Sequence, residues 1–281
     1  MIGQGCDRPA ALALVAVLLQ LPPTLLHAQQ DGYDCVMEAK STIELQSAEE
    51  GILDRVLVKR GDRVKVGEIV ARLNSEQEAL TAARARLRAE SESGIDATKA
   101  QSGFRRKEVE RLEDLRSTNA IPERDYMTAV VESRLAEIAV ETAVMEHDIA
   151  KLEYEQARSH LERRSIRSPV NGIVVDVTMF PGEYVHEQAT VMTIAEIDPL
   201  YVEVFMPVSQ YETVQPGMSA NITPELPIGG IHDAEVAVVD NVFDAASRTF
   251  RVRLVLPNPD YALPAGLRCT VRFLHTDSAS E

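Results

Sequence analysis

Two short segments of the chain alternate hydrophobic and polar residues between glycine-containing turns, and a long helical stretch separates them. Such alternation in residues 45–74 and 165–198 is typical of short β-strands. The two segments match without a gap at a constant displacement of 121 residues. Matched positions include Gly61 with Gly182, Val64 with Val185, and Val70 with Val191. The sequence therefore predicts two copies of one structural unit.

We expect these two copies to pack on each other as one β-sandwich, because four short strands bury too little apolar surface alone. Gly61 and Gly182 each lie in a predicted turn, where a residue without a Cβ tolerates a positive φ. Two unrelated hairpins are the alternative interpretation. The constant spacing argues against it.

Residues 75–164, between the two copies, have a composition typical of helices, with one proline, Pro122, and two glycines. Pro122 suits the first turn of a second helix. The sequence thus predicts an antiparallel hairpin whose arms of about 40 residues each project about 60 Å. In the second arm, apolar residues recur at spacings of four and three, and we expect them to form the seam against the first arm. These residues are Val131, Leu135, Ile138, Thr142, Met145, Ile149 and Leu152.

From residue 199 onward the pattern returns to alternating strands punctuated by proline and glycine. Residues 250–254 present one apolar face and one basic face, as a half-buried strand of a small antiparallel barrel does. We therefore expect a β-barrel after the second copy.

Charge and composition narrow the class of protein. The 281 residues are 45% hydrophobic, which is ample for buried cores. The formal net charge of −15 repels phosphate groups, so nucleic acids and anionic lipid surfaces are excluded as preferred partners.

The N-terminus carries the pattern of a secretory signal peptide. An apolar run over residues 10–19 is followed by Pro22 and Pro23 and by a small-residue exit at Ala28. The run is shorter than the roughly 20 residues of a spanning helix. We expect export and cleavage after Ala28, with an uncleaved anchor as the alternative. Export would leave two cysteines, Cys35 and Cys269, in an oxidising compartment.

Motifs for catalysis, phosphate binding or metal binding are absent from the sequence, so we expect no enzyme, no cofactor and no metal site. Glu183 and His186 have helical ligand spacing, but they fall in a predicted turn and strand. Residues 37–40, MEAK, echo the lysine tetrapeptide of biotin and lipoyl carriers. A carrier lysine belongs at the turn between the two half-motifs, whereas Lys40 precedes the first, so a group carrier is disfavoured.

Residues 58–73 (VKRGDRVKVGEIVARL) and 166–174 (IRSPVNGIV), with the hairpin between them, resemble the HlyD-like membrane fusion proteins, the periplasmic adaptors of tripartite efflux pumps. Residues 244–253 (DAASRTFRVR) and 263–266 (LPAG) resemble the version that accompanies resistance-nodulation-division (RND) transporters. The resemblance implies a non-enzymatic adaptor between an inner-membrane RND transporter and an outer-membrane channel. It also implies self-association into a ring, a trimer or a hexamer.

The resemblance implies an α+β multidomain fold: a lipoyl/biotinyl-like β-sandwich (barrel-sandwich hybrid), interrupted by an antiparallel coiled-coil hairpin and followed by a small antiparallel β-barrel. The expected boundaries are a signal peptide at 1–28, an N-terminal strand joining the barrel region at 29–44, half-motifs at 45–74 and 165–198, the hairpin at 75–164, the barrel at 199–275 and a tail at 276–281. Many members of the family continue into a membrane-proximal domain; because few residues follow the barrel here, we expect that domain to be absent or rudimentary.

The family carries a channel-docking pattern at the hairpin tip, which Arg111, Leu112, Leu115 and Ile121 match. Pro122 stands where the family has a serine, so the tip hydroxyl is missing. A plain seam with a solvated arginine is the alternative interpretation of the same residues.

The resemblance also assigns expected roles in the β domains. Arg251, Arg253 and Arg268 are candidates for contact with the transporter. Since the family's N-terminal strand runs back alongside the barrel, a Cys35–Cys269 disulfide is expected. Two other functions stay open: a type I secretion adaptor, and a periplasmic coiled-coil scaffold without a transporter.

Overall fold

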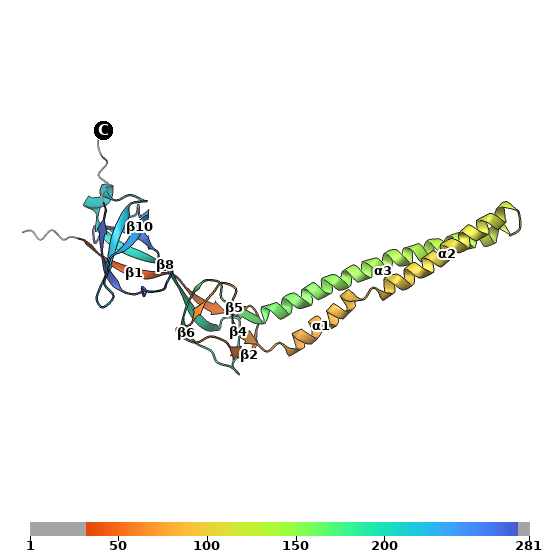
Figure 1. Ribbon diagram of the computed structural model, residues 1–281, viewed down its shortest axis with the longest axis horizontal. Coiled ribbons are helices and arrows are strands. Elements are labelled where there is room, and N and C mark those ends of the chain that lie inside the picture. The colour runs from red at the N-terminus through yellow and green to blue at the C-terminus, as the bar shows by residue number, and fades with distance from the viewer. Residues whose placement is uncertain (1–31, 275–281) are drawn as a thin grey trace, which may run out of the picture.

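The computed structural model describes residues 32–274, and it arranges them as three bodies in a row. Figure 1 shows a β-barrel, a β-sandwich and a long helical rod that points away from both. The predicted signal peptide (1–28) and tail (276–281) lie outside the described residues. Within the described part, no helix combines the length and apolar character needed to cross a bilayer.

The sandwich is built from the two matched segments, which confirms the prediction that they pack on each other. Their strands begin at the same displacement of 121 residues and exchange partners: β2 pairs with β7, and β3 pairs with β6. The first copy contains β2 (Gly51–Val56), β3 (Arg63–Val64) and β4 (Ile69–Leu73). The second contains β6 (Gly172–Val177), β7 (Tyr184–Val185) and the start of β8 (Thr190–Pro207), and β5 (Ser165–Arg167) precedes it and pairs with β4.

The sandwich core repeats with the strands, because equivalent positions of the two copies face the same interior. Four matched pairs are at most 2% exposed. They are Leu53 with Val174, Val64 with Val185, Val70 with Val191, and Leu73 with Ile194. The turns match as well: the amide of Gly61 donates to the Val174 carbonyl and that of Gly182 to the Leu53 carbonyl, both at 2.8 Å. Both glycines have φ near +90°, which explains the residue type.

The barrel closes with six strands in the order β1, β12, β9, β10, β11 and β8, and β1 pairs with β8 to complete the ring. A short 3₁₀ turn, η1 (Val208–Thr213), follows β8. The other strands are β1 (Tyr33–Gln46), β9 (Ser219–Pro224), β10 (His232–Val239), β11 (Thr249–Leu256) and β12 (Arg268–Phe273). β1 and β8 continue from the barrel into the sandwich, so the backbone itself joins the two bodies.

A cluster of side chains reinforces this joint. Nη2 of Arg63, on the sandwich, donates to the Asp260 carbonyl of the barrel at 2.8 Å, and its guanidinium lies 4.8 Å from the Tyr261 ring centroid. The buried Asn258 side chain bonds the Ile197 and Leu263 carbonyls. Arg63 thus adds a polar contact across the joint that β1 and β8 form.

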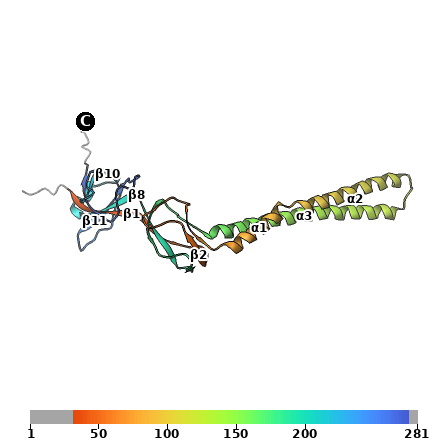
Figure 2. The same cartoon turned by 60° about the horizontal axis from the view of Figure 1, so that its bottom comes forward.

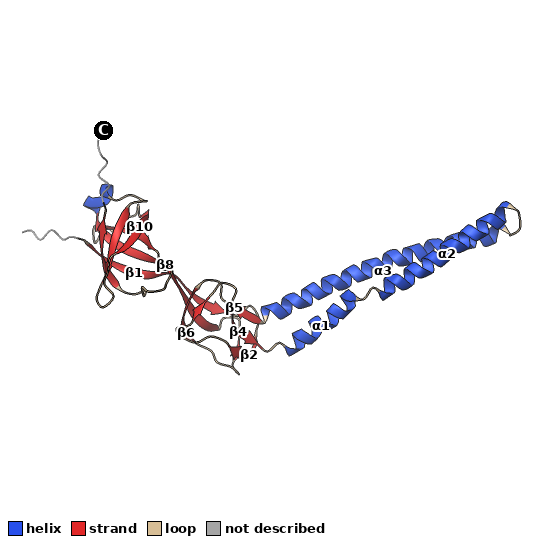
Figure 3. Cartoon of the chain, in the orientation of Figure 1, coloured by secondary structure: helices blue, strands red, loops and turns tan. Residues whose placement is uncertain are grey.

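The rod is the predicted antiparallel hairpin, and Figure 3 shows that only its second arm is continuous. The arms contain α1 (Glu76–Glu90), α2 (Ser93–Ser117) and the 41-residue α3 (Glu123–Arg163). Inward-facing Ala89 and Ile95, on either side of the break, are six residues apart instead of seven. The seven-residue repeat is therefore one residue short at this point. A continuous helix could keep both Ala89 and Ile95 facing the other arm only if it were overwound. His147 Nε2 lies 2.9 Å from the freed Ala89 carbonyl at this break.

The predicted seam of α3 is wrong, because its large apolar residues face solvent. Val131, Leu135, Met145 and Leu152 are 56–70% exposed. Ala129, Ser133 and Ala136 face the first arm instead and are buried. Farther along the same stripe, Ala143, Ala150 and Ala157 are half-buried, as are the larger Val140, His147 and Tyr154. Figure 2 shows the two arms running closely side by side. Small side chains permit that approach. The inward-facing stripe and the outward-facing apolar stripe of α3 both have spacings of three and four residues, so the spacing alone does not say which of them faces the first arm.

Candidate docking surfaces

The predicted tip residues lie together at the end of the rod farthest from the barrel (Figure 1). Arg111 and Leu115 are exposed, whereas Leu112 and Ile121 are half-buried between the arms. Pro122 precedes the first residue of α3 with φ −61° and ψ 141°, so it caps the second arm and offers no hydroxyl. Arg111 has no hydrogen bond or ion pair within the described residues, which leaves its guanidinium available to a partner.

A second arginine, which sequence reasoning missed, holds the tip in shape. Arg116 forms ion pairs with Glu113 at 2.9 Å and with Glu123 across the turn at 3.2 Å. Its guanidinium also lies 4.3 Å from the Tyr126 ring centroid. The Tyr126 hydroxyl and the Arg116 guanidinium hold the pKa of the Glu113 carboxyl below its usual range. The spacing of Glu113 and Arg116 by three residues on one helix is the signal that could have identified this cluster.

The three candidate arginines of the barrel do not share one surface. Arg251 and Arg253 lie on β11 beside Glu203 of β8, whereas Arg268 begins β12 at the end of the barrel nearer the sandwich. Arg253 Nε donates to Glu203 Oε1 at 2.6 Å, and Arg251 Nε donates to Asp240 at 2.9 Å. Both arginines are thus paired with acids of the barrel wall, and Arg251 is the one nearer the far rim.

Glu203 is the residue that organises this wall, and sequence reasoning missed it too. Its side chain is 7% exposed, and Oε2 has no hydrogen-bond donor, with Arg251 Nε 3.6 Å away. Its carboxylate raises the pKa of the Arg253 guanidinium, chiefly through their hydrogen bond. The polar–apolar alternation of β8 gives no sign that an outward-facing acid would be covered by two arginines.

The structure joins Cys35 of β1 to Cys269 of β12 by a disulfide, with an S–S distance of 2.01 Å and Cα atoms 4.9 Å apart. The two residues face each other in the antiparallel register and are 3% exposed. Lys40, farther along β1, pairs with Glu196 at 2.8 Å at the joint between barrel and sandwich. It lies on a strand, away from any turn between the half-motifs.

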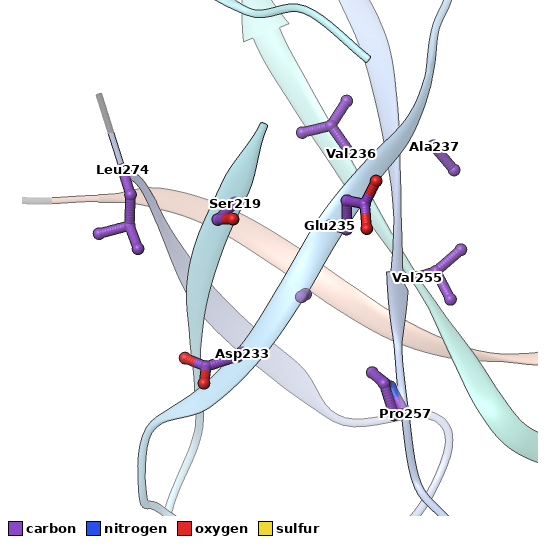
Figure 4. Close-up of a pocket in the computed structure, with 9 residues that line it drawn as sticks. Ser219, Asp233, Glu235, Val236, Ala237, Val255, Pro257 and Leu274 are labelled. Atoms are coloured by element: carbon purple, nitrogen blue, oxygen red, sulfur yellow. The ribbon is translucent and has the colours of Figure 1, made fainter. Parts of the chain in front are cut away.

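A shallow groove lies on the barrel wall, on the outer side of β10 and β11. Figure 4 shows the Asp233 and Glu235 carboxylates on one strand beside Val255, Pro257 and Leu274. The groove is lined by two acids, by Ser219 and by apolar carbons, and no histidine is among these lining residues. No group of three or more potential metal ligands lies within the described residues.

Solved structures with the same fold are membrane fusion proteins. The crystal structure of MacA from Actinobacillus actinomycetemcomitans superposes with a TM-score of 0.70 at 18% identity, covering 86% of this chain and 77% of that one. The membrane fusion protein Spr0693 from Streptococcus pneumoniae R6 gives a TM-score of 0.54 at 14% identity, covering 86% and 98%. These likenesses establish the fold.

Curated relatives match most of this chain but less than half of their own length. The cobalt-zinc-cadmium resistance protein CzcB of Cupriavidus metallidurans is 25% identical over 232 residues, which is 81% of this chain and 41% of that protein. The cation efflux system protein CzcB of Alcaligenes sp. is 24% identical over 232 residues, which is again 81% of this chain and 41% of that protein. The chain therefore spans about two fifths of these relatives.

Family models account for both β bodies and the rod. A CzcB-like barrel-sandwich hybrid domain matches residues 41–196, and a CusB-like β-barrel domain matches residues 199–277. The first match alone covers more than half of the chain. The chain belongs to the CzcB-like barrel-sandwich hybrid family, within the membrane fusion proteins of RND pumps that the sequence resemblance had indicated.

Proposed function

We propose that this protein is a non-enzymatic periplasmic adaptor that links an inner-membrane RND transporter to an outer-membrane channel. One observation carries the proposal: the docking tip and the barrel lie at opposite ends of an elongated molecule (Figure 1). A rigid rod with a contact surface at each end can connect two partners while keeping them at a fixed separation. A compact fold could not.

The two ends suit different partners. The tip presents the unpaired Arg111 guanidinium, a hydrogen-bond donor fork for backbone carbonyls, next to the exposed Leu115. The far rim of the barrel presents the exposed side chains of Phe205 and Val242 near Arg251. We assign the tip to the channel and the rim to the transporter, with Arg251 as the arginine placed to reach it.

Assembly into a ring of several copies, a trimer or a hexamer, belongs to the same proposal. A single hairpin cannot encircle a channel mouth, whereas a ring of heterologous contacts closes on itself. The periplasm is the proposed location, with export by the N-terminal segment.

Site-specific photo-crosslinking in cells tests the assignment of the two ends. A photoreactive residue at Leu115 should capture an outer-membrane channel, and one at Val242 should capture an inner-membrane transporter. The exposed mid-rod position Arg134 serves as the control that should capture neither. Capture of an ATP-driven exporter at Val242 would point to a type I secretion adaptor. Capture of no membrane protein at either end would favour a scaffold and refute the proposal.

Loss of export is the matching physiological test. The two curated relatives are named for cation resistance, so we would compare tolerance to cobalt, zinc and cadmium with tolerance to organic toxicants in a deletion strain. Restoration of tolerance by the wild-type chain, but not by an Arg111→Ala and Leu115→Ala variant, is expected. Equal restoration by both would remove the tip from the proposal.

A further inference from the structure

A cluster of three side chains connects the last turn of α3 to the sandwich, at the point where the rod begins (Figure 1). Arg163 Nε donates to Oε1 of Glu49, which lies in the turn between β1 and β2, at 2.7 Å. Arg163 Nη2 lies 2.7 Å from Nδ1 of His160, and the same Glu49 oxygen lies 3.8 Å from that nitrogen. We call Glu49, His160 and Arg163 the root cluster.

The hydrogen bond from Arg163 fixes the protonation state of His160. A guanidinium can only donate, so Nδ1 of His160 accepts and carries no proton, and the imidazole is neutral. A proton on Nδ1 would point at the guanidinium, and the Glu49 carboxylate would be the acceptor nearest to it. The observed arrangement of the root cluster therefore requires neutral His160.

Among the charged groups around His160, histidine is the residue type that ordinarily changes its charge between pH 5 and 8. The hydrogen bond from Arg163 lowers the pKa of the Glu49 carboxyl, which keeps it ionised in this range. Arg164 and Glu78 line the same hollow of about 240 Å³ as His160 and pair with each other at 2.6 Å. His160 is 49% exposed, and it lies in the last turn of α3, where unpaired carbonyls favour a positive charge.

We propose that protonation of His160 changes the angle between the rod and the sandwich. Neutral His160 and ionised Glu49 together hold the Arg163 guanidinium. Protonated His160 instead takes the Glu49 carboxylate from Arg163. Because His160 precedes Arg163 by three residues, or about 4.5 Å of helix rise, the sandwich turn is then attached farther along the rod.

Arg164 stays in place during this exchange and acts as the pivot. Its Nη1 donates to the Glu50 carbonyl at 2.7 Å, and its own carbonyl accepts from the Leu73 amide at 2.9 Å. Carbonyl groups do not titrate, so both contacts persist in acid. The inference rests on the proposed function for its meaning, because a tilt of the rod moves the docking tip relative to the barrel.

Fluorescence energy transfer between two dyes on the exported chain measures the tilt. The dyes are attached at Arg134→Cys on the rod and Lys65→Cys on the sandwich, two exposed positions, and the native Cys35–Cys269 disulfide is buried and stays in place. We expect the distance between the dyes to change by about 4 Å or more between pH 8 and pH 5. Its midpoint should equal that of the His160 titration followed by NMR.

Two substitutions at position 160 reproduce the two states. The His160→Gln side chain can still accept from Arg163 and cannot be protonated, so the pH 8 distance should persist at pH 5. His160→Lys carries a positive charge at both pH values, so it should show the pH 5 distance already at pH 8. His232→Gln, on β10 of the barrel, is the matched control and should respond to pH as the wild type does.

Three results would overturn the inference. They are an unchanged distance in the wild type, a pH response that persists in His160→Gln, and a His160→Lys variant that behaves as the wild type. Circular dichroism should show equal helix content in all variants, because the side chain at position 160 is half exposed. Photo-crosslinking at Leu115 and Val242 reports on the adaptor function separately, so either proposal can fail without the other.

Discussion

In the barrel wall, Glu203 is a covered carboxylate whose hydrogen-bonded partner is Arg253. Replacement Arg253→Ala leaves this acid with only the longer contact to Arg251. We expect the loss of about 1–3 kcal/mol of unfolding free energy, less than for a fully buried pair because Arg253 is 39% exposed.

Chemical denaturation measures this loss of unfolding free energy. Replacing the Glu203 carboxylate by a neutral side chain tests whether the loss comes from its pairing with Arg253. In a Glu203→Gln background the same Arg253→Ala change should cost clearly less, since a neutral amide needs no counterion. Arg55→Ala, an exposed arginine paired with its neighbour Asp54, is the control and should stay within about 0.5 kcal/mol. Equal losses in both backgrounds would contradict the assignment.

At the tip, the neighbouring Glu113 carboxylate is the main cause that raises the pKa of the Tyr126 phenol, and burial adds to the shift. Glu113→Gln should therefore shift the titration of Tyr126 to lower pH, toward the usual value of about 10. NMR of tyrosine Cζ during an alkaline titration detects the shift. Tyr184, whose pKa is raised by Glu50, should not move, and an unchanged Tyr126 would refute the tip geometry.

The ion pairs of Glu113 at the tip also predict how the stability of the tip changes as the pH falls. Because the folded state lowers the pKa of the Glu113 carboxyl, its stabilising contribution is present above the unfolded pKa of about 4.3 and is lost as the pH falls through the folded value. At neutral pH the Glu113 carboxyl is ionised and its full contribution to the stability of the tip is present.

At the scale of elements, the break between α1 and α2 follows from a repeat that is one residue short between Ala89 and Ile95. Insertion of one alanine after Ser91 restores the spacing of seven. We expect the first arm to become one continuous helix, with slower hydrogen exchange at the amides of residues 89–95. Replacing Ser91 by alanine without insertion is the control. Exchange as fast as in the wild type after insertion would mean that the break has another cause.

At the scale of the whole molecule, the rod is an insert that the β bodies do not need. The strands flanking it are paired, with Arg72 opposite Ser165, and the Leu73 amide donates to the Arg164 carbonyl at 2.9 Å. Neither β core contains a hairpin residue. Replacing residues 75–163 by a four-residue Gly-Ser turn should leave a folded protein with a cooperative thermal transition, but without export function. Unfolding of this variant would show that the rod contributes to the β core.

Much of this architecture follows from the sequence by itself. A displacement of 121 residues, repeated in strands, core positions and turn glycines, determines the sandwich, because equivalent residues of two copies must face one interior. The helical composition of the insert and Pro122 near its middle determine an antiparallel hairpin. These are local or repeated signals, which need no knowledge of distant contacts.

Only the tertiary structure decided which face of each element meets which partner. The seven-residue repeat of α3 carries two stripes, and the close approach of the arms places alanines inside and leucines outside. Likewise Glu203, Arg116 and the Arg63–Tyr261 joint depend on residues far apart in the chain or on a turn that brings two helices together. Periodicity gives the direction of a side chain relative to its own element. The identity of what lies opposite comes only from packing.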